Sequence, residues 1–278
     1  MTTPRIPFDI IDTANGTAVR TSDGVFLRLT GSPIPVWQLH ALAGGRDVAL
    51  DAAGQASWQR VHSAVTTRHE HDAAPTWPTP KSRVLIVCTE PALAHLAADL
   101  AELGADVRSL DVTGVYDSVD LGSVIEITQA LTEFRPALVI WLAGGLPPRA
   151  LWDNLDTLPF RGVAWLRVHR EGSQLWVDPL SLDMTDPSSA QVMKRRLAAS
   201  GTAEELASWL EARTNVPTAM SDLAGRMVGL RLLDMAQAWA FDAERLRIYR
   251  TRAWQFNARS LRASEHTVLA YPEPAPLP

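Results

Sequence analysis

The chain of 278 residues has only one cysteine, Cys88. A single cysteine cannot form an internal disulfide, and it cannot supply the paired thiolates of a tetrahedral zinc site. Long apolar runs are missing too, since no window approaches the ~18 uninterrupted apolar residues of a membrane span. Residues 1–7 lack the basic stretch and apolar run of a secretion signal. These absences predict a cytoplasmic protein with no membrane partner.

Positive charge is also scarce, because 26 Lys and Arg stand against 31 Asp and Glu and give a net charge of -5. A nucleic-acid-binding surface normally needs a basic surplus, so nucleic acid is not an expected partner. The hydrophobic share of 46% and the charged share of 21% are those of a folded soluble protein. Trp141, Trp165 and Trp176 lie inside apolar runs, which predicts that they pack in a core.

A proline-rich stretch divides the chain. Ala-Ala-Pro-Thr-Trp-Pro-Thr-Pro, between Asp72 and Lys81, contains three prolines and has neither a helical nor a strand period. The length of the chain suits either one large domain or a small domain attached to a medium one. We therefore expect a first domain over 1–72, a linker over 73–82 and a second domain over 83–278.

The first domain is predicted to be a small α+β module. Asn15-Gly16 and Asp23-Gly24 are tight-turn signals, each followed by residues that favour strands. Apolar spacings of three and four then predict helices, the first of which stops at Gly44. The expected elements are strands at about 6–12, 17–21 and 24–30, and helices over 36–43 and 55–68.

The second domain shows strands alternating with helices. Such a series predicts a Rossmann-like α/β domain with a right-handed, mainly parallel sheet. Beyond Ser188 three helical segments follow, and the tail holds two β-like pieces near 246–249 and 267–271. The series consists of strands at 83–88, 105–111, 137–142 and 162–168, with helices that end at Gly104 and span about 122–134 and 148–155.

The turn after the first strand of this domain contains no glycine. A doubly wound sheet normally holds a nucleotide on a glycine-rich turn, but here the turn reads Cys88-Thr-Glu-Pro-Ala92. Glu90 would bring a carboxylate near the phosphates, and Pro91 removes an N–H that could have bound them. We therefore expect neither a nucleotide cofactor nor catalysis of the ordinary kind.

Five other features each have a functional and a structural interpretation. Asp111 could meet a ribose but is more typical of a turn, and Gly144-Gly145 could line a pocket or simply connect elements. Cys88 could be a nucleophile, although free cysteine is usually buried. His69 and His71 could bind a metal or lie in solvent, and we expect no metal there. Lys194-Arg195-Arg196 is expected to be a solvated helix face.

Three segments of the second domain resemble the E1-like, or ThiF-like, fold in the degenerate form found in azoline and azole peptide biosynthesis. Active members of this family bind zinc through cysteine pairs and ATP through a glycine-rich turn, whereas residues 184–196 and 265–272 contain no cysteine. The resemblance therefore implies the fold without adenylation, with no catalytic residue, cofactor or metal. It rests on 83–111, 137–187 and 217–240, with its best stretches at Arg161-Gly-Val-Ala-Trp-Leu-Arg-Val-His169, Leu175-Trp-Val-Asp-Pro179, Leu180-Ser-Leu-Asp183 and 221–234.

Proteins similar to this degenerate kind are leader-peptide-binding partners of YcaO cyclodehydratases and carry an N-terminal winged-helix-type module. In such proteins the leader adds as a strand beside the third strand and packs on the third helix, a β-augmentation mode. The resemblance also implies a homodimer that forms through the helices. The peptide-binding residues it implies are Val25, Phe26, Leu27, Arg28 and Leu29 on the strand, and Trp58, Val61, His62 and Val65 on the helix.

Other interpretations remain open at this point. The second domain could belong to a nucleotide-dependent α/β enzyme, either an adenylating enzyme or an oxidoreductase, with an atypical phosphate turn. That alternative predicts measurable nucleotide binding. The first domain could equally be an ordinary small core with no ligand, and the second could act only as a dimerisation platform.

Overall fold

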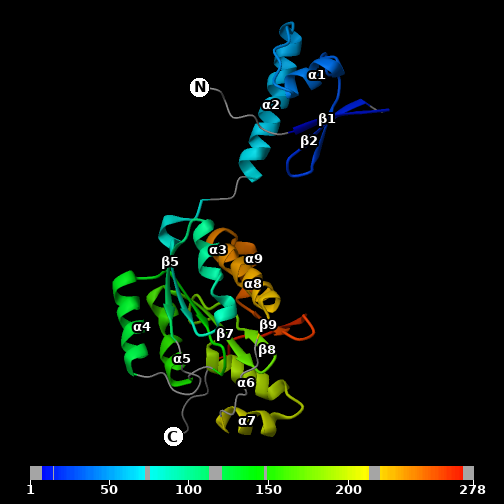
Figure 1. The fold of residues 1–278 in the computed structure, drawn as a ribbon. Helices are drawn as coiled ribbons and strands as arrows, with labels where there is room; N and C mark the ends of the chain where they lie inside the picture. The colour runs from blue at the N-terminus through cyan, green and yellow to red at the C-terminus, as the bar shows by residue number, and fades with distance from the viewer. Residues whose placement is uncertain are drawn as a thin grey trace. The chain divides into compact units, whose positions relative to one another are not determined.

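A computed structural model describes residues 8–14, 16–72, 76–112, 121–146, 149–212 and 220–271, without the side chains of 69–72 and 121–123. The chain consists of two compact units, Met1–Pro75 and Thr76–Pro278 (Figure 1). Each unit has its own hydrophobic core.

The first unit is a three-stranded antiparallel sheet with two helices on one face. The strands lie in the order β1-β2-β3, and the core between sheet and helices contains Ile10, Val19, Leu39 and Val65. This arrangement confirms the expected sequence of three strands followed by helices; the winged-helix assignment stays a prediction. The elements are β1 (Phe8–Thr13), β2 (Gly16–Thr21), β3 (Phe26–Leu29), α1 (Val36–Ala43) and α2 (Ala52–Asp72).

Local interactions set the ends of these elements. The β2–β3 turn places Gly24 at a φ of 83°, a conformation that favours glycine. Helix α2 begins earlier than the apolar spacing predicts because the Asp51 carboxylate accepts the backbone N–H of Gly54 at 2.7 Å. Together with its continuation to Asp72, this makes α2 a helix of 21 residues.

Residues 76–82 belong to the second unit, which shortens the predicted linker. Trp77 is 4% exposed and packs edge-on against Phe241, with 5.2 Å between the ring centroids. Its indole N–H donates to the Lys81 carbonyl, and the Lys81 ammonium donates to the Trp239 carbonyl. The prolines on either side of Trp77 predict a linker, but burial of its large aromatic ring stabilises the packing of this segment against the second unit. Residues 73–75 lie outside the described residues.

The second unit is built on a seven-stranded sheet in the order β10-β9-β8-β7-β6-β4-β5. Strands β5, β4, β6 and β7 are parallel, whereas β7, β8, β9 and β10 pair antiparallel, so the sheet is mixed and not mainly parallel. Only two residues connect β7 to β8, with Gly172 at a φ of 60°, and so short a turn permits only an antiparallel return. The strands are β4 (Arg83–Cys88), β5 (Asp106–Asp111), β6 (Leu138–Leu142), β7 (Ala164–Glu171), β8 (Gln174–Val177), β9 (Arg252–Asn257) and β10 (Arg262–Thr267).

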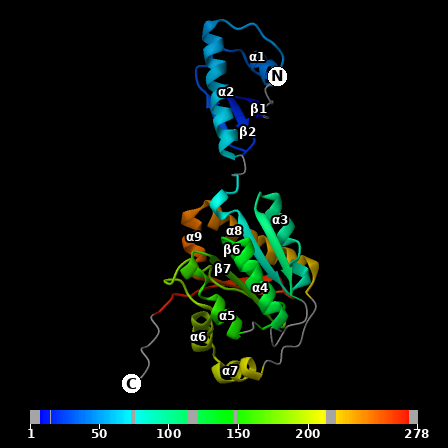
Figure 2. The same ribbon diagram turned by 90° about the vertical axis from the view of Figure 1, so that its left-hand side faces the viewer.

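Helices cover both faces of this sheet (Figure 2). One core lies between the sheet and α3, α8 and α9, and the other lies between the sheet and α4 and α5. Trp141 and Trp165 are buried in the second of these cores, as predicted, while Trp176 is only partly buried. The helices are η1 (Thr79–Lys81), η2 (Pro91–Leu93), α3 (Leu96–Glu102), α4 (Leu121–Phe134), α5 (Arg149–Leu155), η3 (Leu158–Arg161), α6 (Ser189–Ala199), α7 (Ala203–Ala212), α8 (Asp222–Phe241) and α9 (Ala243–Tyr249).

The C-terminal part differs from the prediction. Residues 246–249, expected to be β-like, form the end of helix α9, because the Asp242 carboxylate caps the backbone N–H groups of Glu244 and Arg245, each at 3.0 Å. Strand β9 was not anticipated, and the last strand ends at Thr267 instead of beginning there. In the parts of the chain that the structure describes, no helix is long and apolar enough to cross a bilayer.

Candidate functional site

The predicted strand residues lie at an edge of the first unit's sheet. Within the described residues β3 pairs only with β2, so its other side is open. Leu27 and Leu29 face the core, whereas Phe26 is 61% exposed and Arg28 is exposed on the opposite face. Val25 precedes the strand and is partly buried.

The backbone groups of β3 alternate between its two sides. Thr21 donates its backbone N–H to the Val25 carbonyl at 2.9 Å, which marks this pair as hydrogen-bonded across the hairpin. Because hydrogen-bonded pairs alternate along an antiparallel ladder, Leu27 also directs its N–H and C=O toward β2. Phe26 and Arg28 therefore direct theirs to the open edge, where another strand could pair with them.

A groove of about 430 Å³ lies between β3 and α2. Leu27 and Val61 line it from opposite sides, and Arg28 and Arg60 are the charged residues at it. The residues from the strand side are Val19, Leu27, Arg28, Leu29, Thr30, Gly31 and Ser32, and those from the helix are Ser57, Arg60, Val61 and Ala64.

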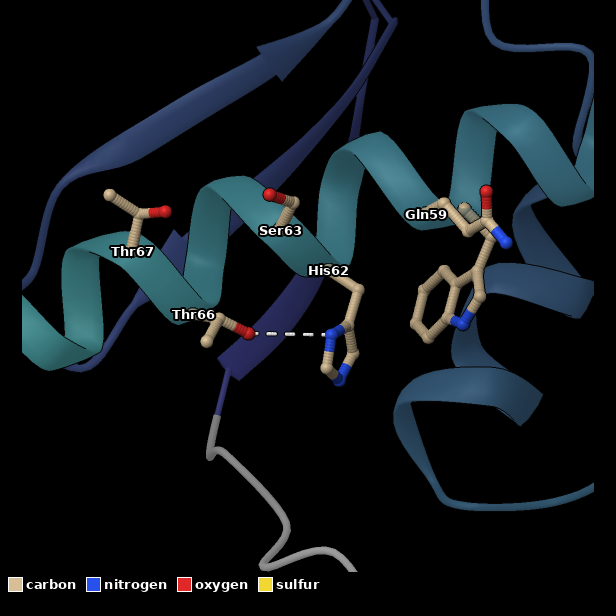
Figure 3. Close-up of a pocket in the computed structure, with 6 residues that line it drawn as sticks. Gln59, His62, Ser63, Thr66 and Thr67 are labelled. Carbon is tan, nitrogen blue, oxygen red and sulfur yellow. Dashed lines mark hydrogen bonds between the residues drawn. The ribbon is translucent and has the colours of Figure 1, made fainter.

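The structure brings only one of the four predicted helix residues to this groove. Val61 lines it, but Val65 is buried in the core at 2% exposure. Trp58 and His62 line a separate open hollow with Thr66 (Figure 3). The groove-lining helix residues that the sequence analysis missed are small or polar, so an apolar pattern could not reveal them.

Helix geometry explains this division. Trp58, His62 and Thr66 recur every four residues and share one face of α2, where the Thr66 hydroxyl lies 3.3 Å from His62 Nδ1. The Trp58 ring packs near Phe8, with 6.0 Å between the ring centroids. This face is therefore turned toward β1 and not toward the open edge of β3.

A second candidate site is the strand-end crevice of the second unit, where this fold places a nucleotide. The Glu90 carboxylate accepts the backbone N–H of Ala92 at 3.4 Å, a donor that a phosphate would need. Its other oxygen accepts from the Arg170 guanidinium at 2.5 Å, and both side chains are buried. The residues present therefore do not fit a phosphate, because a carboxylate and its own cation already fill the turn.

Backbone packing closes the same crevice. Gly144, which could have lined a pocket, donates its N–H to the Thr89 hydroxyl at 2.8 Å, and a Cβ there would lie 2.9 Å from the Thr89 carbonyl oxygen. On the helix side, a Cβ on Gly225 of α8 would lie 2.3 Å from the Ala92 carbonyl oxygen. Both glycines thus permit close contact with the turn and leave it no space.

Cys88 and Asp111 show no arrangement for chemistry. Burial raises the pKa of the Cys88 thiol to about 11, and the thiol donates to the Glu90 carbonyl at 3.2 Å. A thiol with so high a pKa is a poor nucleophile. Asp111 ends β5 and is exposed, and none of the described residues forms a hydrogen bond or ion pair with its side chain. The side chains of His69 and His71 lie outside the described residues.

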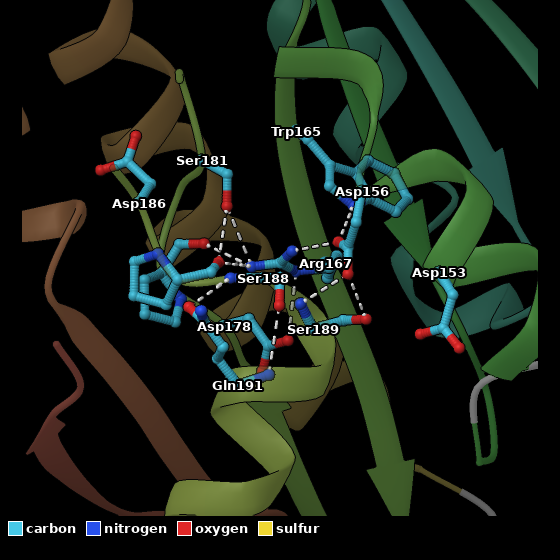
Figure 4. Close-up of polar contacts among 12 residues, drawn as sticks. Asp153, Asp156, Trp165, Arg167, Asp178, Ser181, Asp186, Ser188, Ser189 and Gln191 are labelled. Carbon is cyan, nitrogen blue, oxygen red and sulfur yellow. Dashed lines mark hydrogen bonds and ion pairs between the residues drawn. The ribbon is translucent and has the colours of Figure 1, made fainter. Parts of the chain in front are cut away.

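The sequence analysis missed a buried polar network on β7 (Figure 4). Arg167 is fully buried and binds Asp156 at 2.7 Å and Asp178 at 3.2 Å. Asp156 also accepts from the Trp165 indole and from the backbone and hydroxyl of Ser189. The sequence feature that could have revealed the network is a charged residue, Arg167, inside the apolar run 163–168. The network joins β7 to the N-terminus of α6, and its polar groups bind one another, so we assign it a structural role.

Lys194 and Arg195 are exposed, as predicted for a solvated helix face, but Arg196 is not. Its guanidinium binds both carboxylate oxygens of Glu171, at 2.7 and 2.8 Å, and stacks 3.9 Å from the centre of the Trp176 ring. Glu171 also lies 3.2 Å from His169. Burial alone would raise the pKa of Glu171, but its hydrogen bonds and charge interactions with His169 and Arg196 outweigh burial and lower that pKa to about 2.

Comparison with known proteins gives a likeness of fold. No family model and no curated protein matches the chain. A heterocyclase solved in complex with substrate and cofactor is 14% identical, with a TM-score of 0.50 over 95% of this chain and 38% of its own. The E. coli microcin synthetase McbBCD complex contains a chain that is 11% identical, with a TM-score of 0.46 over 96% of this chain and 97% of its own.

The heterocyclase TruD is 15% identical, with a TM-score of 0.48 over 95% of this chain and 40% of its own. The chain thus spans about two fifths of each heterocyclase and almost the whole microcin synthetase chain. At such identities the likeness concerns the fold alone. The chain therefore shares the fold of the heterocyclase solved with substrate and cofactor, a likeness that agrees with the resemblance seen in the sequence.

Proposed function

We propose that the first unit binds the leader segment of a ribosomally made precursor peptide as an added strand at the open edge of β3. The observation that carries this proposal is the edge itself. It presents the backbone groups of Phe26 and Arg28 beside a groove lined by α2. Main-chain hydrogen bonds to an exposed edge supply affinity, and pockets for alternate side chains supply specificity.

The dimensions of the site suit an extended peptide of a few residues. Strand β3 has four residues, and the groove of about 430 Å³ runs along it. An open edge beside an apolar groove is also a site that a protein normally protects, because it invites pairing with other chains. Here the groove would bury the apolar side chains of a bound peptide and so make the pairing selective.

We propose that the second unit is a non-catalytic adaptor that presents the bound precursor to a YcaO-type cyclodehydratase. The ion pair between Glu90 and Arg170 supports this role, since it occupies the position where an active relative would bind phosphate. The chain shares its fold with 38% of a heterocyclase solved in complex with substrate and cofactor, and this likeness supports a role beside such an enzyme. In this proposal the partner supplies ATP and activates the peptide backbone.

We also propose that the adaptor is a homodimer, as the family resemblance implies. Helix α8 exposes Leu223 at 58% and Leu230 at 65%, which lie seven residues apart on one face. Sedimentation equilibrium at micromolar concentration should give twice the mass of the chain. A monomer at all concentrations, with Leu230→Gln unchanged in mass, would remove the dimer from the proposal.

Fluorescence anisotropy tests the central proposal. The probes are fluorescein-labelled peptides that cover the N-terminal halves of short open reading frames beside the gene, titrated with the full chain. We expect one of them to bind in the micromolar range or tighter, and MgATP to show no binding by calorimetry at millimolar concentration. Binding of MgATP, without binding of any peptide, would favour the nucleotide-dependent enzyme instead.

A further inference from the structure

Two arginines lie at the peptide groove, one on each of the elements that form it. Arg28 belongs to β3 and Arg60 to α2, and both line the groove while being exposed. Neither guanidinium has a hydrogen bond, ion pair or ring contact with any of the described residues. Two neighbouring arginines differ from them: Arg68 binds Asp23 at 2.5 Å, and Arg20 lies 3.9 Å from Asp9. Unpaired cations beside a groove with no acidic residue in its lining favour an anionic ligand.

The register of the sheet fixes the face on which that ligand's charge must lie. Phe26 pairs with Arg20, and Arg28 pairs with Ala18, in rows on the outer face of the sheet. A strand added beyond β3 extends these rows, because directly paired residues project to the same face. In the added strand, the residue beside Arg28 therefore projects to the outer face. The residue beside Phe26 is two positions away along that strand and projects to the same face.

The residues between them point inward. They lie beside Leu27 and Leu29 and enter the groove against Val61 and Ala64. These four side chains are apolar. A charged peptide side chain among them would be desolvated without gaining a partner, unless it reached Arg60. The inward positions of the peptide are therefore apolar.

We infer, resting on the proposed function, that the recognised segment is an acidic amphipathic strand. A carboxylate side chain lies opposite Arg28 on the outer face, an apolar or aromatic side chain lies opposite Phe26, and apolar side chains alternate with them into the groove. In an antiparallel arrangement the core of the segment reads apolar, acidic, apolar, aromatic. Arg60 adds a second positive charge at the helix wall and favours further carboxylates beside this core.

A charge-swap selection tests this pattern with the full chain. The probe is a phage-displayed library of random 12-residue peptides, selected separately on the wild-type protein, on Arg28→Glu and on Arg46→Glu. Arg46 is exposed and does not line the groove, so its variant is a matched control for net charge. We expect wild type and the Arg46 variant to enrich Asp or Glu at one position of an alternating apolar strand. The Arg28 variant should enrich Lys or Arg at that same position.

Binding of one selected peptide then measures the size of the effect. An exposed ion pair is weak and screened by salt, so Arg28→Glu should weaken binding of the acidic peptide by about three- to tenfold at low ionic strength. Replacing its Glu by Lys should restore affinity for the variant. Selected peptides without an acidic preference, and equal affinity for wild type and variant, would overturn the inference while the edge-binding function stands. If neither the wild type nor either variant enriches any peptide, both the inferred acidic pattern and the proposed peptide-binding function are overturned.

Discussion

Arg170 Nη1 lies 2.5 Å from Glu90 Oε2 across the turn that follows β4. The two side chains come from elements 80 residues apart in the sequence, and both are buried. Glu90 also accepts the N–H of Ala92, so one carboxylate fills the anion site of the turn and neutralises the cation beside it. The position that would bind phosphate is thus part of the protein's own packing.

This pair predicts a strong dependence of stability on either partner. Glu90→Ala leaves the Arg170 charge buried without its counter-ion, and we expect the free energy of unfolding to fall by about 3–5 kcal/mol. The double variant Glu90→Ala, Arg170→Met removes both charges and should recover most of that loss. Urea denaturation measures both changes. Glu102→Ala, on the exposed face of α3, is the control and should leave the midpoint unchanged. Equal midpoints for Glu90→Ala and wild type would contradict the assignment.

Acid should weaken the second unit through Glu171. Its pKa of about 2 in the folded protein lies below the ordinary value of 4.5 for a glutamate, so its ionised form stabilises the fold. That contribution is complete above about pH 5 and is lost as the pH falls toward 2. We expect Glu171→Gln to lower the free energy of unfolding by about 3–4 kcal/mol at pH 7, on the scale of ~1.4 kcal/mol per pKa unit.

The pH series supplies the control for this prediction. Denaturation of wild type and Glu171→Gln at pH 7, 5 and 3 should show the difference between them shrinking as the pH falls. Glu133→Gln changes the carboxylate of an exposed ion pair with Arg108 and should show little difference at any pH. A difference between wild type and Glu171→Gln that stays constant from pH 7 to pH 3 would show that charge does not carry the effect.

The fold was predictable where burial follows a simple period. Strand β4 reads as five apolar residues after Arg83, and the missing glycines of the next turn were visible directly. Strand β10 has all six residues exposed, so no apolar pattern marks it, and it forms only because β9 offers an edge. Arg167 escaped notice because its partners come from three separate segments of the chain.

Only part of the groove lining on α2 could be predicted from the sequence. Apolar spacing along α2 selects the residues that face the core, and it correctly selected Val61 and Val65 as a pair. A ligand surface lies beside the core face, where residues are small or polar, such as Ser57, Arg60 and Ala64. Only the position of β3 relative to α2 shows which flank of the helix is open.

Cys88 should react slowly with thiol reagents. With a pKa of about 11, its thiolate is rare at pH 8, and we expect alkylation or disulfide exchange to be at least ~100-fold slower than for an unfolded chain. Because it is the only cysteine, absorbance with Ellman's reagent reports on this residue alone. The reference is the same protein unfolded in about 6 M urea. Native and unfolded rates within tenfold of each other would exclude a protected thiol.

The open edge of β3 makes the sharpest prediction about peptide binding. The alternation of the ladder directs the Phe26 N–H away from β2, so proline at this position removes a donor for an added strand but spares the hairpin. Phe26→Thr also loses the aromatic ring, yet it keeps the N–H and favours a strand. We expect the proline variant to bind the tightest leader-derived peptide about tenfold more weakly than the threonine variant, as one lost hydrogen bond and a steric clash imply.

Anisotropy titration of both variants against the same labelled peptide measures this difference. Thermal melts followed by circular dichroism check that the hairpin survives, because Leu27 and Leu29 still provide the bonds to β2. The comparison isolates the backbone, since both variants lack the same ring. If the proline and threonine variants are both folded and bind with equal affinity, the peptide is held by side-chain contacts alone. That result would contradict binding as an added strand.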